Sequence, residues 1–532
     1  MEHVLLYDTT LRDGLQREGM SLSVDEQIAI AKEIAAFGMH YLEAGFPMSN
    51  PKHAEMFEAL RDVDLGDTRI AAFGMTRRKG VAAAADPAMV GLAECFAPVI
   101  TIVGKTWDLH IEKVIKVDRG ENLAMIAESV AYLKGRGKEV IYDAEHFFDA
   151  YAAHPDYAVE CLRAAHEAGA DWVTLCDTNG ATLPHQVAAA TRHVREALPD
   201  ANIGIHTHND AECGVANSLA SVTEGARMVQ GTVNGYGERC GNANLVSIVP
   251  SLSLKLGFAT VPEENLAHLT ALSHFVAETA NLQPDNWAAY VGRNAFAHKG
   301  GMHVAGMLAD ERTFEHINPA AVGNERRVLV SELSGRGTIV AKAREMGLEI
   351  EDGPEVPRIL TRLKELEHEG YHFEVADASF ELLIERELGR FEPLFALESF
   401  RVVTEKRADG QVETEATVKL THDGERLVAI GEGNGPVNAL DQALRAALEV
   451  RVPELADVQL VNFKVRILDE GKGTGATTRV LIDSGAAQGA ETWGAIGVSQ
   501  NVIEASWDAL VDSLVYGVAR VRRGAGVGAA GR

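Results

Sequence analysis

Two histidines separated by a single residue form the clearest chemical pattern in the chain. His206 and His208 stand at the end of Asn202–His206, a short apolar run typical of a β-strand. Residues i and i+2 of a strand project to the same side, so both imidazoles face one way. Imidazoles placed like this form half of a site for a divalent ion. Taken alone, the pair could equally be two partly exposed polar residues at a strand end.

Oxygen ligands for such an ion stand in two other segments. Asp13 follows the first predicted strand, and Asn242 follows the eighth. If the strands close into a barrel, both segments lie near the strand that carries His206. Two nitrogens and two oxygens suit Mn²⁺, Zn²⁺ or Co²⁺, and Mg²⁺ less naturally. We therefore predict one divalent metal ion held by Asp13, His206, His208 and Asn242.

Three further polar residues follow predicted strands. Arg12 beside a metal would hold a substrate carboxylate or a developing oxyanion, although an isolated arginine is often a surface salt-bridge residue. Glu145 would act as a general base or orient one; a buried, ion-paired carboxylate is the alternative. Thr178 would donate a hydrogen bond to a substrate carboxylate, or else belong to a turn or a helix N-cap.

His303 lies well beyond these residues and follows the pair Gly300–Gly301. Glycine adopts backbone angles that other residues avoid, so this arm could close over a site. His303 is then a candidate for proton transfer. A structural or solvated histidine is the alternative.

The elements that must position these groups alternate between short strand-like runs and amphipathic helical stretches. Several helical stretches end in glycine just before the next strand, as at Gly38, Gly137 and Gly169. Eight such repeats over residues 1–258 predict a (β/α)₈ TIM barrel, in preference to a doubly wound open sheet. The predicted strands are Val4–Asp8, Tyr41–Ala44, Arg69–Phe73, Val99–Val103, Glu139–Ala144, Trp172–Cys176, Asn202–His206 and Arg227–Gly231.

The rhythm changes after the barrel. Residues 259–390 are predicted to form a mostly helical linker region, and residues 391–521 a separate α+β domain. In that domain, Gly431–Pro436 opens a predicted helix and is either an anion or effector pocket or a plain loop. Residues 522–532 are rich in Gly and Ala without periodicity, and we predict a disordered tail.

Charge and composition exclude several classes of partner. The chain has 532 residues with 50 Lys+Arg against 77 Asp+Glu, a net charge of −27. This acidity argues against a nucleic-acid groove or an anionic membrane surface as the main partner. No apolar run approaches the ~20 residues of a membrane-spanning helix. The five cysteines form no CxxC pair, which predicts a reduced, cytoplasmic protein without a disulfide frame.

The motifs around these residues resemble one enzyme family. Asp8–Gln16, Gly204–Asp210 and Asn234–Asn242 are similar, in this order, to the barrel signatures of 2-isopropylmalate, homocitrate and citramalate synthases. Arg327–Arg336 resembles their linker subdomain, and residues from about 391 resemble their C-terminal regulatory domain. Within the family, the longer type of citramalate synthase is most similar, through Lys105–His110, Asp143–Asp149 and Glu491–Ser499.

The resemblance implies a reaction and a set of roles. The family's metal ligands fall on Asp13, His206, His208 and Asn242, keto-acid binding on Arg12 and Thr178, and acid/base work on Glu145 and His303. The implied substrates are pyruvate and acetyl-CoA, joined to give (R)-citramalate for isoleucine synthesis. A homodimer with an isoleucine effector is implied as well. Phe314 stands where many relatives carry a tyrosine thought to help proton transfer.

Three alternatives stay open at this level. The same chemistry could use another acceptor, 2-oxoisovalerate or 2-oxoglutarate. A related lyase could cleave a hydroxyacyl-CoA with a cysteine near strand eight, although Cys240 stands in the synthase pattern Glu238–Asn242. A non-catalytic amino-acid sensor would retain only the binding function of the C-terminal domain.

Overall fold

The computed structural model describes residues 2–49, 51–486 and 492–529. Glu491, at which one of the resembling segments begins, and residues 530–532 of the predicted tail lie outside the described residues. The chain divides into two compact units. The first comprises residues up to Phe296 together with His316–Arg326, and the second comprises Ala297–Glu315 and the residues from Arg327 onward.

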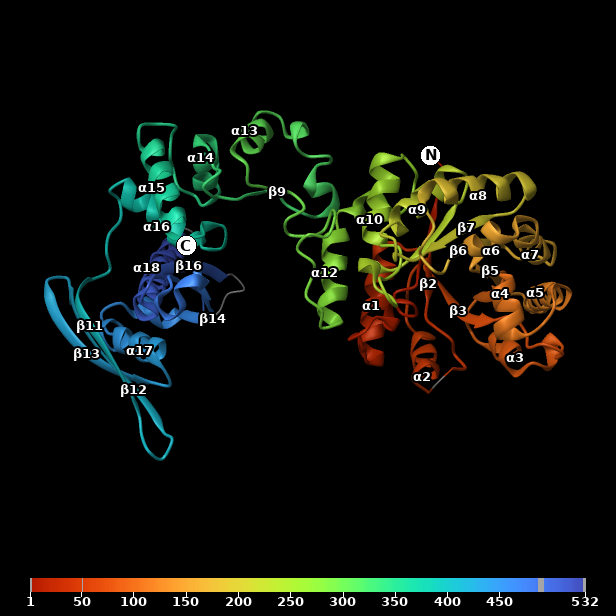
Figure 1. The fold of residues 1–532 in the computed structure, drawn as a ribbon, viewed down its shortest axis with the longest axis horizontal. Coiled ribbons are helices and arrows are strands. Elements are labelled where there is room, and N and C mark those ends of the chain that lie inside the picture. The colour runs from red at the N-terminus through yellow and green to blue at the C-terminus, as the bar shows by residue number, and fades with distance from the viewer. Residues whose placement is uncertain (1, 50, 487–491, 530–532) are drawn as a thin grey trace. The chain divides into compact units, whose positions relative to one another are not determined.

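The first unit is built on a closed barrel of eight parallel strands in the order β1 to β8 (Figure 1). The predicted barrel and each of its eight strands are confirmed. The strands are β1 Leu5–Asp8, β2 Tyr41–Glu43, β3 Arg69–Met75, β4 Val99–Lys105, β5 Glu139–Glu145, β6 Trp172–Asp177, β7 Ile203–Thr207 and β8 Met228–Gly231. Backbone pairing of β1 with β8 closes the ring, because Leu5 pairs with Met228 and Asp8 with Gly231.

Helices follow the strands and cover the barrel from outside. The first shows why they begin and end where they do: Ser23 and Glu26 form a reciprocal capping box at its start, and Gly38 ends it at a φ of 96°. The α-helices of this unit are α1 Val24–Phe37, α2 Pro51–Leu60, α3 Pro87–Glu94, α4 Asp108–His110, α5 Arg119–Lys134, α6 Phe147–Ala153, α7 Pro155–Glu167, α8 Pro184–Ala197, α9 Gly214–Thr223, α10 Leu245–Pro250, α11 Glu263–Leu266 and α12 Leu269–Thr279.

The barrel interior changes character along the strands. Toward their amino ends it is filled by a cluster of buried apolar side chains that includes Tyr41, Ala71, Val99, Ile141 and Met228. Two residues further along the strands, most inward positions become polar, and several of these side chains hydrogen-bond to one another. This polar layer contains Glu43, Thr101, Asp143, Thr174 and Gln230, and the hydroxyl of Tyr7 reaches it from the apolar cluster. The layer forms the floor of the site described below.

The second unit begins with a small helical part. The two short strands β9 Ala297–His298 and β10 Arg327–Val328 pair in parallel. The α-helices here are α13 Gly301–Ala309, α14 Arg336–Glu345, α15 Glu355–Glu369 and α16 Asp377–Glu387. With α11 and α12 of the first unit, they make the stretch between barrel and C-terminal domain mostly helical, as predicted.

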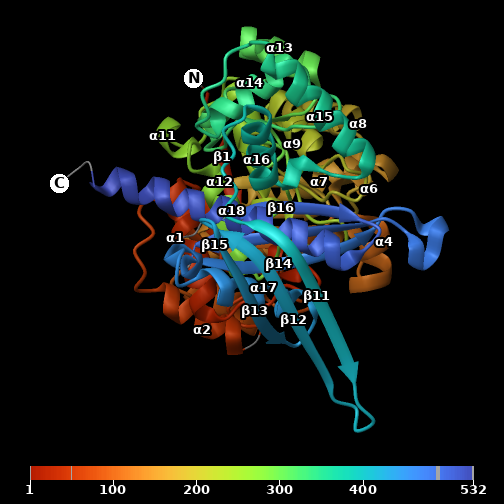
Figure 2. The ribbon, with the colours of Figure 1, turned by 90° about the vertical axis from the view of Figure 1, so that its left-hand side faces the viewer.

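The rest of the second unit contains two three-stranded antiparallel sheets, each followed in the chain by one helix (Figure 2). The elements are β11 Ala396–Lys406, β12 Val412–His422, β13 Glu425–Gly433 and α17 Pro436–Leu448, then β14 Val458–Ile467, β15 Thr478–Ala486, β16 Thr492–Ser499 and α18 Val502–Ala529. The α+β class is confirmed, but the sequence pattern predicted neither β13 nor β16. Residues 522–529, for which we expected no regular structure, continue α18. None of the helices in the described part of the chain could cross a membrane.

Candidate active site

A pocket of about 330 Å³ lies at the carboxyl ends of the barrel strands. Most of its walls are inward-facing residues at positions i and i+2 of a strand, which project to the same side. It is lined by Arg12, Asp13, Gln16, Phe73, Met75, Val103, Lys105, Asp143, Glu145, Cys176, Thr178, His206, His208, Glu238 and Arg239. Every barrel residue predicted for the site is therefore in the pocket wall, except Asn242, which is buried and contacts two of them.

Three of the four predicted metal ligands converge on one point. Nε2 of His206 lies 3.5 Å from Oδ2 of Asp13, and Nδ2 of Asn242 lies 3.3 Å from each of these two atoms. The other amide atom, Oδ1 of Asn242, is buried without a hydrogen-bond partner in the described residues. A half-turn of the amide exchanges its oxygen and nitrogen, which directs three potential ligand atoms at the same place.

His208 stands beside this group without joining it. Its backbone forms an isolated antiparallel bridge with Asn242, which ties the end of β7 to the segment after β8. Its ring centroid lies 5.3 Å from that of His206. Nδ1 of His208 is buried and has no hydrogen-bond partner within the described part of the chain. An imidazole nitrogen in this condition is suited to a metal, because a bound ion would satisfy it.

A buried glutamine orients His206. Gln230 donates from Nε2 to Oδ1 of Asp143 (2.9 Å) and to Oγ1 of Thr174 (3.3 Å), so its Oε1 faces Nδ1 of His206 at 2.8 Å. An amide oxygen only accepts, so Nδ1 of His206 must carry the hydrogen. Nε2 is then the unprotonated nitrogen, and it is the atom that faces Asp13 and Asn242. Outer partners of this kind orient most metal-binding histidines.

The charges of these groups suit a cation. Burial lowers the pKa of His206, and it lowers the pKa of His208 to about 3 with a further contribution from His206. For Asp13 burial acts in the opposite direction, but its neighbours, with Arg12 as the largest contributor, hold the pKa below its ordinary value. At neutral pH the set is therefore two neutral imidazoles and one carboxylate, the protonation states that metal binding requires.

Arg12 is held rigidly at the pocket wall. Its guanidinium pairs with Glu43 through Nε and with Asp13 through Nη1, and its Cζ lies 4.0 Å from the centroid of the Phe73 ring. Glu43 is itself buried and accepts a hydrogen bond from the hydroxyl of Tyr7 at 2.8 Å. We find no hydrogen bond from Nη2 of Arg12 to any described residue. That nitrogen is left to bind an anion in the pocket.

Glu145 and Thr178 face the pocket from neighbouring strands. Glu145 forms an ion pair with Nζ of Lys105, and the two side chains are 20% and 12% exposed. The hydroxyl of Thr178 accepts a hydrogen bond from the backbone N–H of His146 at 2.8 Å. Because that contact uses a lone pair of the oxygen, the hydroxyl hydrogen is left to donate to a ligand.

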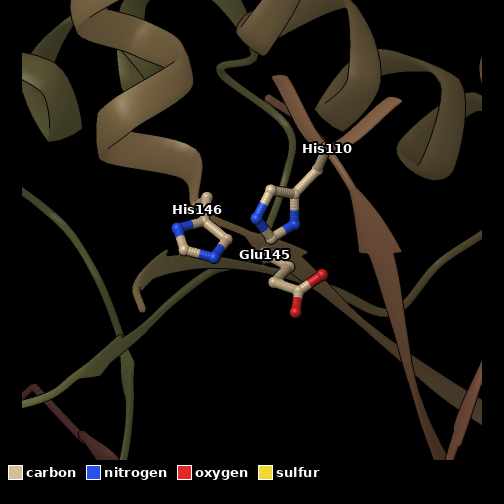
Figure 3. A group of neighbouring side chains, drawn as sticks. All are labelled: His110, Glu145 and His146. Atoms are coloured by element: carbon tan, nitrogen blue, oxygen red, sulfur yellow. The ribbon is translucent and has the colours of Figure 1, made fainter. Parts of the chain in front are cut away.

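A second group of potential metal ligands includes Glu145. His110, Glu145 and His146 bring one nitrogen or oxygen each within 4.8 Å of one another (Figure 3). Sequence reasoning placed no metal here, because His110 follows β4 whereas Glu145 and His146 stand at the end of β5, and only the pairing of these strands brings the segments together.

His303 belongs to the second unit, so its role at the barrel stays a prediction. It lies in α13, two residues after Gly301 at the helix start. Its ring stacks on Phe314, with centroids 4.4 Å apart and planes 27° apart. Phe314, which the resemblance implied to replace a tyrosine, is thus in direct contact with the predicted proton-transfer histidine.

Sequence reasoning missed four residues that support the site: Glu43, Lys105, Asp143 and Gln230. Two of them had a recognisable pattern. Lys105 stands two positions after Val103, and Asp143 stands two positions before Glu145, so each shares a face with a pocket residue. Glu43 and Gln230 had no such pattern, because their importance depends on partners in other strands.

Three family models match consecutive parts of the chain. Residues 3–276 match the HMGL-like family, residues 290–371 match the homocitrate synthase post-HMGL domain-like family, and residues 374–518 match the LeuA allosteric (dimerisation) domain. The first match covers more than half of the chain.

Curated proteins are similar over nearly the whole length. The chain is 51% identical to the (R)-citramalate synthase of Aquifex aeolicus, over 97% of this chain and 98% of that protein. It is 49% identical to the (R)-citramalate synthase of Geobacter sulfurreducens, again over 97% of this chain and 98% of that protein. Identity to the 2-isopropylmalate synthase of Clostridium kluyveri is 31%, over 96% of each chain.

Proposed function

Since the chain belongs to the (R)-citramalate synthases of the HMGL-like family, we propose that it condenses acetyl-CoA with pyruvate and releases (R)-citramalate and CoA. The observation that carries this proposal is sequence identity over nearly the full length. It is 51% to a citramalate synthase and 31% to a 2-isopropylmalate synthase. The enzyme is thus an acyltransferase that converts the acyl group to an alkyl group on transfer.

The choice of keto acid is tested by competing acceptors. Phe73, Met75 and Val103 give the pocket an apolar stretch of wall. This wall would receive the methyl group of pyruvate. Release of CoA should be fastest with pyruvate in a panel that also contains 2-oxobutanoate, 2-oxoisovalerate and 2-oxoglutarate. Faster release with 2-oxoisovalerate would instead assign a 2-isopropylmalate synthase.

Asp13, His206, His208 and Asn242 would hold one divalent ion. Their protonation states, the orientation of His206 and the unsatisfied atoms of His208 and Asn242 all fit this role. Such an ion, when bound, polarises the ketone carbonyl of the keto acid. His206→Ala should abolish turnover and leave the fold intact, as judged by circular dichroism. Full activity of thoroughly chelated enzyme would contradict the assignment.

Arg12 and Thr178 would bind and orient the keto acid. The fixed guanidinium of Arg12 can hold the carboxylate and stabilise the alkoxide that forms when the ketone is attacked. Thr178 can donate its hydroxyl hydrogen to the same carboxylate. Arg12→Lys keeps the positive charge but loses the planar guanidinium with its fixed N–H donors. We therefore expect a raised KM for pyruvate together with a lowered kcat.

Glu145 and His303, singly or as a relay, would remove a proton from the methyl group of acetyl-CoA. The ion pair with Lys105 holds the carboxylate of Glu145 at the pocket wall, where a base would have to stand. The resulting carbanion attacks the carbonyl carbon of pyruvate, and water then hydrolyses the thioester to release CoA. Hydrolysis of the thioester makes the overall reaction irreversible.

The C-terminal domain supports assembly of two chains. Residues 374–518 match an allosteric dimerisation domain. Edge strand β14 exposes Val461, Phe463, Val465 and Ile467, which alternate along the strand and therefore share one face. An exposed apolar edge strand is a liability unless another chain covers it. We therefore propose a homodimer, measurable as the molar mass of the purified enzyme in solution.

We also propose that isoleucine binds this domain and inhibits the enzyme. Phe380 of α16 and Ile496 of β16 are buried in one apolar cluster, so removing residues after 390 would expose core side chains. The test therefore uses the full chain. Isoleucine should lower turnover and raise the melting temperature of the C-terminal domain. Valine and leucine serve as comparison ligands, and no response to isoleucine would reject this effector.

A further inference from the structure

The group formed by His110, Glu145 and His146 is not used by the proposed reaction except through Glu145. Glu145 is the last residue of β5, and His146 follows it at the start of α6. Consecutive strand residues normally point to opposite faces. His146 has a φ of 55° and a ψ of 34°, a left-handed conformation that is uncommon for residues other than glycine, and it ends the strand there.

His110 reaches the same place from the neighbouring strand. It ends α4, the short helix that follows β4, and β4 pairs with β5. The imidazoles of His110 and His146 meet edge to face with centroids 4.2 Å apart, and the ring of Trp107 lies 5.7 Å and 5.5 Å from them. Figure 3 shows both rings beside the Glu145 carboxylate. Packing of the three rings leaves little freedom to either imidazole.

His146 has the outer contact of a metal ligand, and His110 has a nitrogen that a metal would satisfy. Nδ1 of His146 lies 3.0 Å from Oδ2 of Asp149, which also accepts a hydrogen bond from Nδ2 of Asn179 at 3.0 Å. A carboxylate at Nδ1 orients the ring and leaves Nε2 as the nitrogen that faces away from it, as in carboxylate–histidine–zinc arrangements. Nδ1 of His110 is buried and has no hydrogen-bond partner among the described residues.

Two imidazoles and one carboxylate, with a fourth position open, are a donor set that zinc prefers. Tetrahedral zinc with bonds of about 2.0–2.2 Å requires ligand atoms roughly 3.4 Å apart, which the present cluster reaches with a small closing movement. We propose that His110, Glu145 and His146 form a second divalent-metal site, selective for Zn²⁺, that is separate from the site at Asp13 and His206.

Occupancy of this site would inhibit the enzyme. A bound zinc ion takes the carboxylate of Glu145 away from Lys105 and blocks its use as a base. This consequence, unlike the site itself, rests on the proposed function of Glu145. Free zinc would then lower turnover without displacing the ion that supports catalysis.

The first test measures binding without activity. In a chain carrying His206→Ala and His208→Ala, which lacks the catalytic metal site, Co²⁺ is the spectroscopic probe. We expect one Co²⁺ per chain with the intense visible absorption of a four-coordinate ion, displaced by Zn²⁺. Adding His110→Asn should remove it, and adding His146→Asn should do the same, because asparagine tolerates the left-handed backbone at that position. The nearby exposed His154 is the matched control, and His154→Asn should leave binding unchanged.

The second test measures inhibition of the otherwise unaltered enzyme in saturating Mg²⁺. Initial rates are followed by loss of the thioester absorbance, so that no thiol reagent binds the zinc. Micromolar Zn²⁺ should inhibit, and His110→Asn should raise the half-inhibitory concentration at least tenfold, while His154→Asn should not. Absence of Co²⁺ binding in the first test, or binding that survives both His110→Asn and His146→Asn in folded protein, overturns the site. Binding that passes the first test but leaves turnover unaffected by zinc upholds the site and refutes the role of Glu145 as the base.

Discussion

Replacement of Gln230 by methionine tests how the barrel prepares His206 for a metal. Gln230 is fully buried and contributes three hydrogen bonds, to His206, Asp143 and Thr174. Methionine has nearly the same volume and makes none of them. Nδ1 of His206 then loses the acceptor that keeps its hydrogen in place, so the ring is free to turn or to adopt the other tautomer.

The expected loss follows from these contacts. Removing an outer partner of a metal-binding histidine typically weakens metal affinity by about 10–100-fold, which corresponds to roughly 1.4–2.7 kcal/mol. Asp143 also loses a hydrogen bond that favours its charged form, and its pKa, which burial followed by Glu43 already raises to about 7, should rise further. The free energy of unfolding should fall by about 2–4 kcal/mol, since net buried hydrogen bonds contribute about 1 kcal/mol each and those to charged groups more.

Calorimetric titration of the metal-free protein with Mn²⁺ measures the affinity, and kcat is measured at metal saturation. The matched control is Gln27→Met. Gln27 is a buried glutamine of α1 whose side-chain amide makes one hydrogen bond in the described structure, from Nε2 to the carbonyl of Leu22 at 3.3 Å. This control removes the same amide far from the pocket and should leave Mn²⁺ affinity unchanged. Folded Gln230→Met protein with wild-type Mn²⁺ affinity would show that Gln230 does not prepare His206 for the metal by holding the hydrogen on Nδ1.

The remaining predictions concern the acid/base pair, the composite site and the C-terminal domain. His303→Ala and Glu145→Ala should each lower kcat by roughly 10²–10⁴, and the double variant should be little slower than the slower single one if the two residues act together. Mixing inactive His303→Ala and Asp13→Ala chains should restore part of the activity if His303 serves the barrel of its partner; no recovery after proven subunit exchange would place it over its own barrel. Asp508→Asn should stabilise the protein at high pH. Burial, followed by Asp512 and Glu504, raises the pKa of Asp508 to about 6 from 3.8, so the folded state binds this proton more tightly than the unfolded state. The destabilisation of the folded state by ionised Asp508 is absent below about pH 4, grows as pH rises and is complete above about pH 6. The full shift corresponds to about 3 kcal/mol, which partial solvent exposure reduces to about 1–2 kcal/mol. Urea denaturation of both proteins at pH 4.5 and pH 8 measures this, and an equal difference at the two pH values would contradict it.

The barrel could be predicted from the sequence because the patterns that indicate its strands and helices each lie within a short stretch of the chain. Each strand is a short apolar run, and stops such as Gly38 separate the helices from the strands that follow. The chemical groups could be predicted for the same reason. His206, Asp13 and Glu145 stand at strand ends, and the carboxyl ends of parallel strands must meet at one end of a closed barrel.

Two strands of the C-terminal domain could not be predicted, and their glycines explain why. Gly494 and Gly497 lower the strand propensity of β16, and Gly431 and Gly433 do the same in β13. A Cβ at Gly497 would lie 2.0 Å from the carbonyl oxygen of Ala505, and one at Gly431 would lie 2.2 Å from the backbone nitrogen of Ala443. These glycines allow α18 and α17 to pack directly on the sheets, a requirement that appears only once the helices are in place.

The chemical types present in the pocket were determined by the sequence alone, whereas their partners were decided by the tertiary structure. Gln230 lies 87 residues from Asp143, and Lys105 lies 40 residues from Glu145, yet each pair is in direct contact. The register between neighbouring strands and the closure of the ring bring these partners together, and neither is encoded by the residues next to them in the chain. The tautomer of His206, the ion pair of Glu145 and the proximity of His110 to His146 therefore depend on the folded barrel, because each is set by a contact between different strands or the loops that follow them.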